Sequence, residues 1–339
     1  MAKMRTALSS IVAVVLLAGA VVLQAARERW YPPAVEEETA MYLRSAEAVR
    51  VMSGPYAPLA ADLYWIRVIQ YYGGTKHRLN PEWGRDGVVA PVARPVAARP
   101  AGDDSYGLLY PMLDVTTTLD PRFNIAYRFG AIFLAEAYPS GPGRPDLAID
   151  LLKKGLRERP DKWEYMEDIA FVHYWYEHDY IAASEWFEKA GAAPGAPWWM
   201  KSMAATTRAR GGDRNASRLM WEAIRQTTEI PWLRQDAEQK LEQLRALDEI
   251  DLLQRIVDDV AAKSGQRPGD WSALVRARAL GGVPVDPRGT PYELTPEGRV
   301  RLSQSSPLFP LLVEPPSQTE TGVRAGSDPT LTPVPVRPR

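Results

Sequence analysis

Cysteine is absent from the 339 residues, which excludes disulfides, thiolate metal sites and cysteine nucleophiles. Three histidines are too few for an extensive histidine-based metal centre. Charge of one sign is not in excess either, because 41 basic side chains meet 42 acidic ones and leave a formal charge of −1. This balance gives no bulk electrostatic reason to bind nucleic acid, which favours a concentrated basic face.

The motifs of common catalytic sites are also missing. We find no phosphate-binding glycine loop, no G-x-S-x-G elbow and no H-E-x-x-H pair. The nearest set of metal-ligand types is His173, Glu177 and His178, but on a helix His178 points about 100° away from Glu177. We therefore expect no catalytic site, no cofactor and no metal. An enzyme stays possible only if its site is assembled from distant helices.

What the chain does contain is typical of a folded protein, with 45% apolar and 24% charged residues. Residues 7–26 are almost uncharged, and twenty helical residues span about 30 Å, the thickness of a bilayer core. Lys3 and Arg5 precede this run, which favours a cytoplasmic N-terminus. The prediction is a single-pass inner-membrane protein with its bulk in the periplasm. The alternative is a signal peptide cleaved after Ala18-Gly19-Ala20.

Proline and glycine divide the rest of the chain. The predicted parts are a membrane anchor at 1–30, a membrane-proximal helical hairpin at 31–83, a proline-rich linker at 84–107, helical repeats at 108–247, a C-terminal module at 248–306 and a disordered tail at 307–339. The hairpin would pair a helix ending near Met52 with one over 57–72, the second ended by Gly73 and Gly74.

Small residues recur in the repeat region at positions where two helices would cross closely. They are Gly130, Ala148, Gly155, Ala170, Ala183, Ala190, Ala204, Ala216 and Ala223. Large apolar residues such as Phe129, Phe187 and Met220 are placed between them, as core residues. This spacing resembles that of the tetratricopeptide repeat, a 34-residue helical hairpin, over three units. The resemblance implies an all-α fold in which an α-solenoid follows the transmembrane helix.

In that family the first helix of each hairpin lines a concave groove for peptides. Carried onto this chain, the resemblance implies a protein-binding groove lined by Asn124, Tyr127, Glu164, Glu167, Phe171, Tyr174, Trp198, Lys201 and Arg208. The mixture of acidic, aromatic and basic side chains suits an extended peptide or a partner helix. The alternative is that three repeats curve too little and their own helices fill the groove.

Charged helices with a leucine-rich stripe are predicted over 232–264 and lead from the repeats into the C-terminal module, in which a short helix opens at Asp270. A β-hairpin is predicted from 290–294 and 299–302, with turns at 286–289 and 296–298. Residues 284–302 are locally similar to the C-terminal segment of type II secretion pseudopilins, which carry an Asp-Pro-x-Gly-x-Pro-Tyr stretch. The N-terminus lacks the prepilin cleavage motif of that family.

Together these features predict a membrane-anchored, tetratricopeptide-like adaptor for protein partners in a bacterial envelope assembly, of the secretion or pilus type. The alternative is a structural subunit of a membrane complex without a ligand groove.

Overall fold

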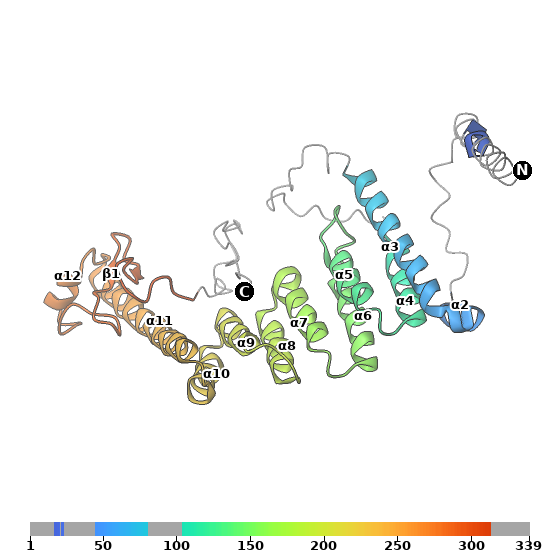
Figure 1. Ribbon diagram of the computed structural model, residues 1–339. Coiled ribbons are helices and arrows are strands. Elements are labelled where there is room, and N and C mark those ends of the chain that lie inside the picture. The colour runs from blue at the N-terminus through green and yellow to red at the C-terminus, as the bar shows by residue number, and fades with distance from the viewer. Residues whose placement is uncertain (1–16, 21, 24–44, 81–103, 313–339) are drawn as a thin grey trace, which may run out of the picture. The chain divides into compact units, whose positions relative to one another are not determined.

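The computed structural model describes residues 17–20, 22–23, 45–80 and 104–312. The described part of the unit Ser45–Arg339 is mostly helical (Figure 1). Its elements are α2 (Ala46–Ser53), the 3-10 turn η1 (Gly54–Tyr56), α3 (Ala57–Leu79), α4 (Leu109–Leu119), α5 (Asn124–Ala135), α6 (Pro145–Glu158), α7 (Trp163–Val172), the π-helical turn η2 (His173–Glu177), α8 (Tyr180–Ala192), α9 (Trp199–Arg210), α10 (Arg214–Thr227), α11 (Pro231–Ser264), α12 (Trp271–Arg276), β1 (Glu293–Leu294) and β2 (Val300–Arg301).

Four helices start at a polar side chain that caps their first turn. Asp179, Asp213 and Asp270 accept hydrogen bonds from backbone N–H groups three residues ahead, at 2.9, 3.0 and 2.7 Å. Ser45 does the same for α2 at 3.3 Å. Each cap satisfies one of the N–H groups that a helix start leaves unpaired, which stabilises the helix by about 1 kcal/mol.

The helices pack as successive hairpins in a solenoid-like arrangement (Figure 1). The pairs are α5 with α6, α7 with α8, and α9 with α10, as the small-residue spacing predicted, and α10 then packs on α11. A further pair, α3 with α4, precedes them. Of the expected hairpin between a helix ending near Met52 and one over 57–72, residues 31–44 lie outside the described residues, and within the described residues α3 packs mainly against α4.

Helix α3 also runs past Gly73 and Gly74, which were expected to end it. A glycine inside a helix costs about 1 kcal/mol relative to alanine. The turn beyond them is held by tertiary contacts, because Thr75 and Lys76 are buried and the Lys76 ammonium lies 2.8 Å from a carboxylate oxygen of Glu136. These contacts offset the weak helix propensity of the two glycines.

Seven of the nine small positions are buried, namely Gly130, Ala148, Gly155, Ala170, Ala183, Ala190 and Ala204. A Cβ on Gly130 would lie 2.5 Å from a methyl of Leu113 in α4, and one on Gly155 would lie 2.8 Å from the Tyr165 ring in α7. Larger side chains at these two positions would push the helices apart. The prediction that small residues mark the close crossings is confirmed there.

The register predicted for α10 is wrong by one residue. Ala223 is exposed and Ala216 half-buried, whereas Ser217, Trp221 and Ile224 are buried. The Ser217 hydroxyl donates to the Ala205 carbonyl of α9 at 2.7 Å. Since Trp221 has far more apolar surface to bury than a methyl group, the helix turns this side toward α9 and α11.

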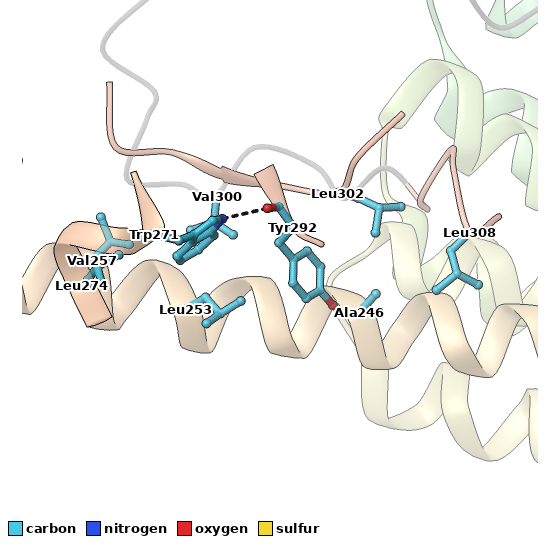
Figure 2. Close-up of a cluster of buried hydrophobic side chains, with 9 residues drawn as sticks. All are labelled: Ala246, Leu253, Val257, Trp271, Leu274, Tyr292, Val300, Leu302 and Leu308. Atoms are coloured by element: carbon cyan, nitrogen blue, oxygen red, sulfur yellow. Dashed lines mark hydrogen bonds between the residues drawn. The ribbon is translucent and has the colours of Figure 1, made fainter. Parts of the chain in front are cut away.

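The C-terminal module packs along α11, which is one continuous helix rather than several (Figure 2). Trp271 of α12 donates its indole N–H to the Tyr292 carbonyl at 2.7 Å. The short hairpin is present, with Leu294 opposite Val300. Asp286 closes the turn before it by accepting from the N–H groups of Arg288 and Thr290, both at 2.9 Å. Residues 284–302 thus cover the apolar side of α11.

Residues 307–312, expected to belong to the disordered tail, pack on α11 instead. Leu308 is fully buried, and the Gln243 amide donates to the carbonyls of Leu308 and Pro310 at 2.9 and 2.8 Å. Residues 313–339 lie outside the described residues, and so do residues 84–103 of the predicted linker.

The described helices contradict the predicted membrane location. Among the described residues, none of the helices combines the length and the apolar character needed to cross a bilayer. This finding overturns the prediction of a single-pass inner-membrane protein with a periplasmic bulk. Of the apolar run at 7–26, only residues 17–20 and 22–23 are described, as helix, and the remainder lies outside the described residues.

Candidate protein-binding surface

Two of the nine predicted groove residues are buried and do not line a groove. Tyr127 is fully buried between α4 and α7, with its ring 5.2 Å from the Tyr165 ring and its hydroxyl 3.4 Å from the Thr117 carbonyl. Burial raises the pKa of Tyr127, which stays neutral. Glu167 is 8% exposed and lies 3.4 Å from the Arg128 guanidinium. Both side chains belong to the packing between hairpins.

Five more predicted residues are half-buried: Asn124, Glu164, Phe171, Tyr174 and Arg208. Four of them are engaged by the chain itself. Phe171 packs edge-on against Phe187 at 5.2 Å, and Glu164 pairs with Lys162. Tyr174 accepts a hydrogen bond from Arg210 at 2.6 Å, and Arg208 donates to Asp213 at 3.0 Å. These contacts leave little of the four side chains for a ligand.

The remaining two predicted residues, Trp198 and Lys201, are exposed. Trp198 lies against Trp232, the second residue of α11, with ring centroids 4.7 Å apart. The structure therefore does not gather the nine residues into one open groove. Of the nine, the two exposed residues lie at the start of α9.

A charged cluster joins α5 to α7 at the predicted groove. The Arg128 guanidinium binds Asp168 through two hydrogen bonds, of 2.6 and 2.9 Å. Desolvation first, and then the neighbouring Asp168 carboxylate, raise the pKa of Glu167 to about 7, although Arg128 opposes the shift. The cluster links the two hairpins through α5 and α7.

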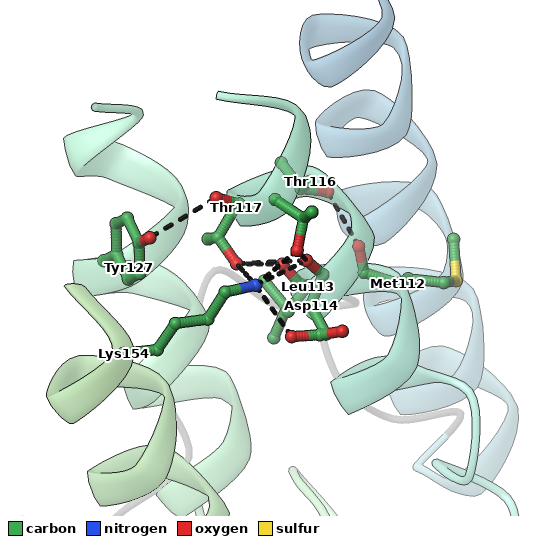
Figure 3. Close-up of polar contacts among 8 residues, drawn as sticks. Met112, Leu113, Asp114, Thr116, Thr117, Tyr127 and Lys154 are labelled. Atoms are coloured by element: carbon green, nitrogen blue, oxygen red, sulfur yellow. Dashed lines mark hydrogen bonds and ion pairs between the residues drawn. The ribbon is translucent and has the colours of Figure 1, made fainter. Parts of the chain in front are cut away.

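A second polar network joins α4 to α6 and is also internal to the fold (Figure 3). The Lys154 ammonium lies 2.7 Å from a carboxylate oxygen and 2.8 Å from the carbonyl oxygen of Asp114. It also lies 2.9 and 2.6 Å from the hydroxyls of Thr117 and Thr118. Because an ammonium has three protons, these four acceptors already exceed its donors. Lys154 is therefore a structural tie between helices.

Metal ligands do not converge in the described part of the chain, where no group of three or more His, Asp or Glu side chains could hold an ion. His173 and Glu177 do meet, with Nδ1 2.6 Å from a carboxylate oxygen. His178 lies outside this pair, because it ends the π-helical turn in the left-handed conformation at φ 54°.

The exposed apolar residues gather instead on α3 and α5. Along α5, Ile125, Phe129 and Ile132 are 49%, 51% and 46% exposed at a spacing of four and three residues, so they share one side of the helix. Phe129 was expected in the core. On α3, a similar exposed set has the same helical spacing. We call these residues the α3–α5 apolar face: Leu59, Leu63, Ile66, Ile69, Ile125, Phe129 and Ile132.

An aromatic contact links the two halves of this face. Trp65 of α3 stacks on Phe133 of α5 with centroids 6.0 Å apart and planes 5° from parallel. Trp65 also meets Phe123 edge-on at 6.1 Å, and Tyr72 stacks on Phe133 at 4.2 Å. Ile66 follows Trp65 directly in α3 and Ile132 precedes Phe133 directly in α5, so an exposed residue of each stripe adjoins a member of this aromatic contact along the chain. Helical spacing places the members of each stripe on one side of their helix, but it does not reveal that this side stays exposed within the described part of the chain.

Comparisons with known proteins add no relative, because no family model, no curated protein and no solved structure matches this chain.

Proposed function

We propose that the protein is a helical-repeat scaffold that binds a partner protein through the α3–α5 apolar face. The resemblance of its small-residue spacing to tetratricopeptide repeats supports this function, because such hairpins present side chains of successive helices to one ligand. The proposal concerns binding alone and assigns no reaction. It does not include the membrane anchor or the envelope setting that depended on it.

The observation that carries the proposal is the exposure of seven apolar side chains on two neighbouring helices. Single exposed apolar residues are ordinary on protein surfaces, whereas contiguous apolar patches mark sites of interaction. Burying a side chain of this size contributes about 1.5–3 kcal/mol when it leaves water completely. A partner covering Ile66, Ile69, Phe129 and Ile132 would therefore gain enough to offset much of the entropy lost on association.

The shape of the face suits an amphipathic helix. Each half is a helical stripe, and the Trp65–Phe133 contact joins the two helices that carry them. A helix with apolar residues at positions i, i+3, i+4 and i+7 could lie along this contact and bury its apolar side against both halves. Recognition by this means requires no charged partner residue.

Capture from cell extract tests the proposal. The full chain is compared with Ile66→Glu and Ile132→Glu, each of which places a charge within the apolar face. The matched control is Leu219→Glu, because Leu219 of α10 is 73% exposed and lies in another hairpin. We expect the wild type and the control to retain the same partner and both test variants to lose it, with unchanged circular dichroism. Retention by both test variants would refute the proposed surface.

A further inference from the structure

Two exposed tryptophans, Trp198 and Trp232, contact one another at the start of α9 and α11. Their exposed fractions are 47% and 53%, their centroids are 4.7 Å apart and their planes meet at 79°. Tryptophan is highly buried on average, so two accessible indoles in edge-to-face contact are uncommon on a protein surface. We call these residues the tryptophan pair.

The tryptophan pair is held on rigid elements. Trp198 is the N-cap residue of α9, two residues before the fully buried Met200. Trp232 is followed by Leu233, which is 4% exposed in the core between α10 and α11. Neither indole N–H donates a hydrogen bond to a residue in the described part of the chain. The pair thus presents fixed aromatic faces together with two indole N–H groups that have no hydrogen-bond partner among the described residues.

Such a surface has the features that recognise a polyproline II segment. That conformation has no internal hydrogen bonds, so its carbonyls are free to accept from indole N–H groups. Its proline rings pack on aromatic faces, and its preformed backbone loses little entropy on binding. The chemistry of the tryptophan pair therefore favours a proline-rich peptide over a helix.

The described chain ends close to this surface. Residues 307–312 run along α11, where the Gln243 amide donates to the Leu308 and Pro310 carbonyls. Leu312 then lies against the core cluster that contains Leu233, the residue after Trp232. The segment that follows Leu312 therefore starts beside the helix that carries half of the tryptophan pair.

We propose that residues 332–339 dock on the tryptophan pair of the same chain. Their sequence, Thr-Pro-Val-Pro-Val-Arg-Pro-Arg, contains three prolines, of which Pro335 and Pro338 form a P-x-x-P spacing. This is the composition expected of a polyproline II ligand. The proposal concerns a different surface from the α3–α5 apolar face and does not depend on a partner binding there.

The chain between Leu312 and the proposed docking segment is long enough to reach the tryptophan pair. About twenty residues separate Leu312 from Pro333, and a flexible chain of that length has a root-mean-square span of about 25 Å. Gln243, which anchors Pro310, lies eleven residues after Trp232 in α11, a distance of about 16 Å along the helix. A tether of this kind gives an effective concentration of about 1 mM, so even a weak contact would be substantially occupied.

Charge gives the docked segment a direction. Asp236 lies one turn after Trp232, on the same side of α11, and forms no ion pair within the described residues. It is placed to receive Arg337 when the prolines cover the indoles. Lys201 lies one turn after Trp198 and would repel the same arginine, so the arginine end lies toward α11.

The absence of cysteine makes a direct test possible, because an introduced cysteine is the only thiol. Val336→Cys in the full chain is labelled with a small dye whose emission is quenched by contact with indole. We expect quenched emission in the native protein and recovery of emission in the same chain carrying Trp198→Leu and Trp232→Leu. Trp175→Leu is the matched control, because Trp175 is 57% exposed in η2 and should leave the quenching unchanged.

Two further measurements decide the outcome. Quenching that is constant over a hundredfold dilution supports docking within one chain, whereas quenching that disappears on dilution would assign the segment to a second copy and overturn the proposal. Replacing Pro333, Pro335 and Pro338 by alanine should also restore emission. Emission that is unquenched in the native chain, or that recovers equally with Trp175→Leu, would refute the docking.

Discussion

Ala183 provides the sharpest test of how the helical hairpins pack. It is fully buried in α8, which packs against both α7 and α9, and its cluster includes Ala170, Phe187 and Ala204. Ala183→Leu would insert three heavy atoms between helices that meet through small side chains. Overpacking of this kind costs about 1–3 kcal/mol. For a protein of this size each kcal/mol lowers Tm by about 1.5 °C.

The neighbouring Ala182 is the matched control. It is half-buried, about 100° around the helix from Ala183, and should accept leucine at a cost of about 0.5 kcal/mol. The assay is thermal and urea unfolding of the two full-length variants followed by circular dichroism. We expect Ala183→Leu to lose a few degrees more than Ala182→Leu. Equal losses, or a larger loss at Ala182, would show that the close crossing has been misplaced.

Three other predictions concern the fold. Trp221→Ala should destabilise by about 3–5 kcal/mol and Met220→Ala by clearly less in urea unfolding; the reverse order would restore the predicted register of α10. Between pH 4.5 and 7, Glu167 binds its proton more tightly when folded, so unfolding free energy should fall as pH rises, by up to about 3 kcal/mol. Glu167→Gln should flatten this slope, and an unchanged slope would show that Glu167 is not the source of the pH dependence. Gln243→Ala removes two hydrogen bonds worth about 1 kcal/mol each, so limited proteolysis should cut near Leu308 faster than in the wild type.

The local residue pattern was sufficient to predict the helices of most of the repeat region. The hairpins from α5 to α10 follow from the spacing of small residues and the turn residues between them, and Ala183 rather than Ala182 is buried as the register required. Glycine and alanine at close crossings are constrained by contact between backbones, which depends on positions only a few residues apart. Such constraints can be read directly from a sequence.

Competing patterns explain the errors in the fold. In α10, Ala216, Met220 and Ala223 form the expected small–large–small series, whereas the buried side is Ser217, Trp221 and Ile224, one residue further on; the alanine series concealed the larger gain from burying Trp221. The pairing of α3 with α4 could not be inferred from local pattern, because residues 80–108 separate the two helices in the chain. The contacts of Lys76 with Glu136 likewise join residues sixty positions apart.

The binding surface was harder to predict than the fold. A family register placed Tyr127 and Glu167 in a groove, but close packing of the hairpins buries both. Phe129 was assigned to the core because an apolar residue at helical spacing ordinarily faces a neighbouring helix. Whether an apolar stripe is covered depends on the number and placement of surrounding helices, which is a property of the whole fold.

The most direct test of the central claim is capture by the full chain, compared with Ile132→Glu and with the control Leu219→Glu. Ile132 lies in the α3–α5 apolar face beside Phe133, whereas Leu219 is exposed on another hairpin. If the apolar face is the binding surface, the wild type and Leu219→Glu recover the same partner in equal amounts, and Ile132→Glu loses at least tenfold, the equivalent of about 1.4 kcal/mol. Equal recovery by all three proteins would contradict the account.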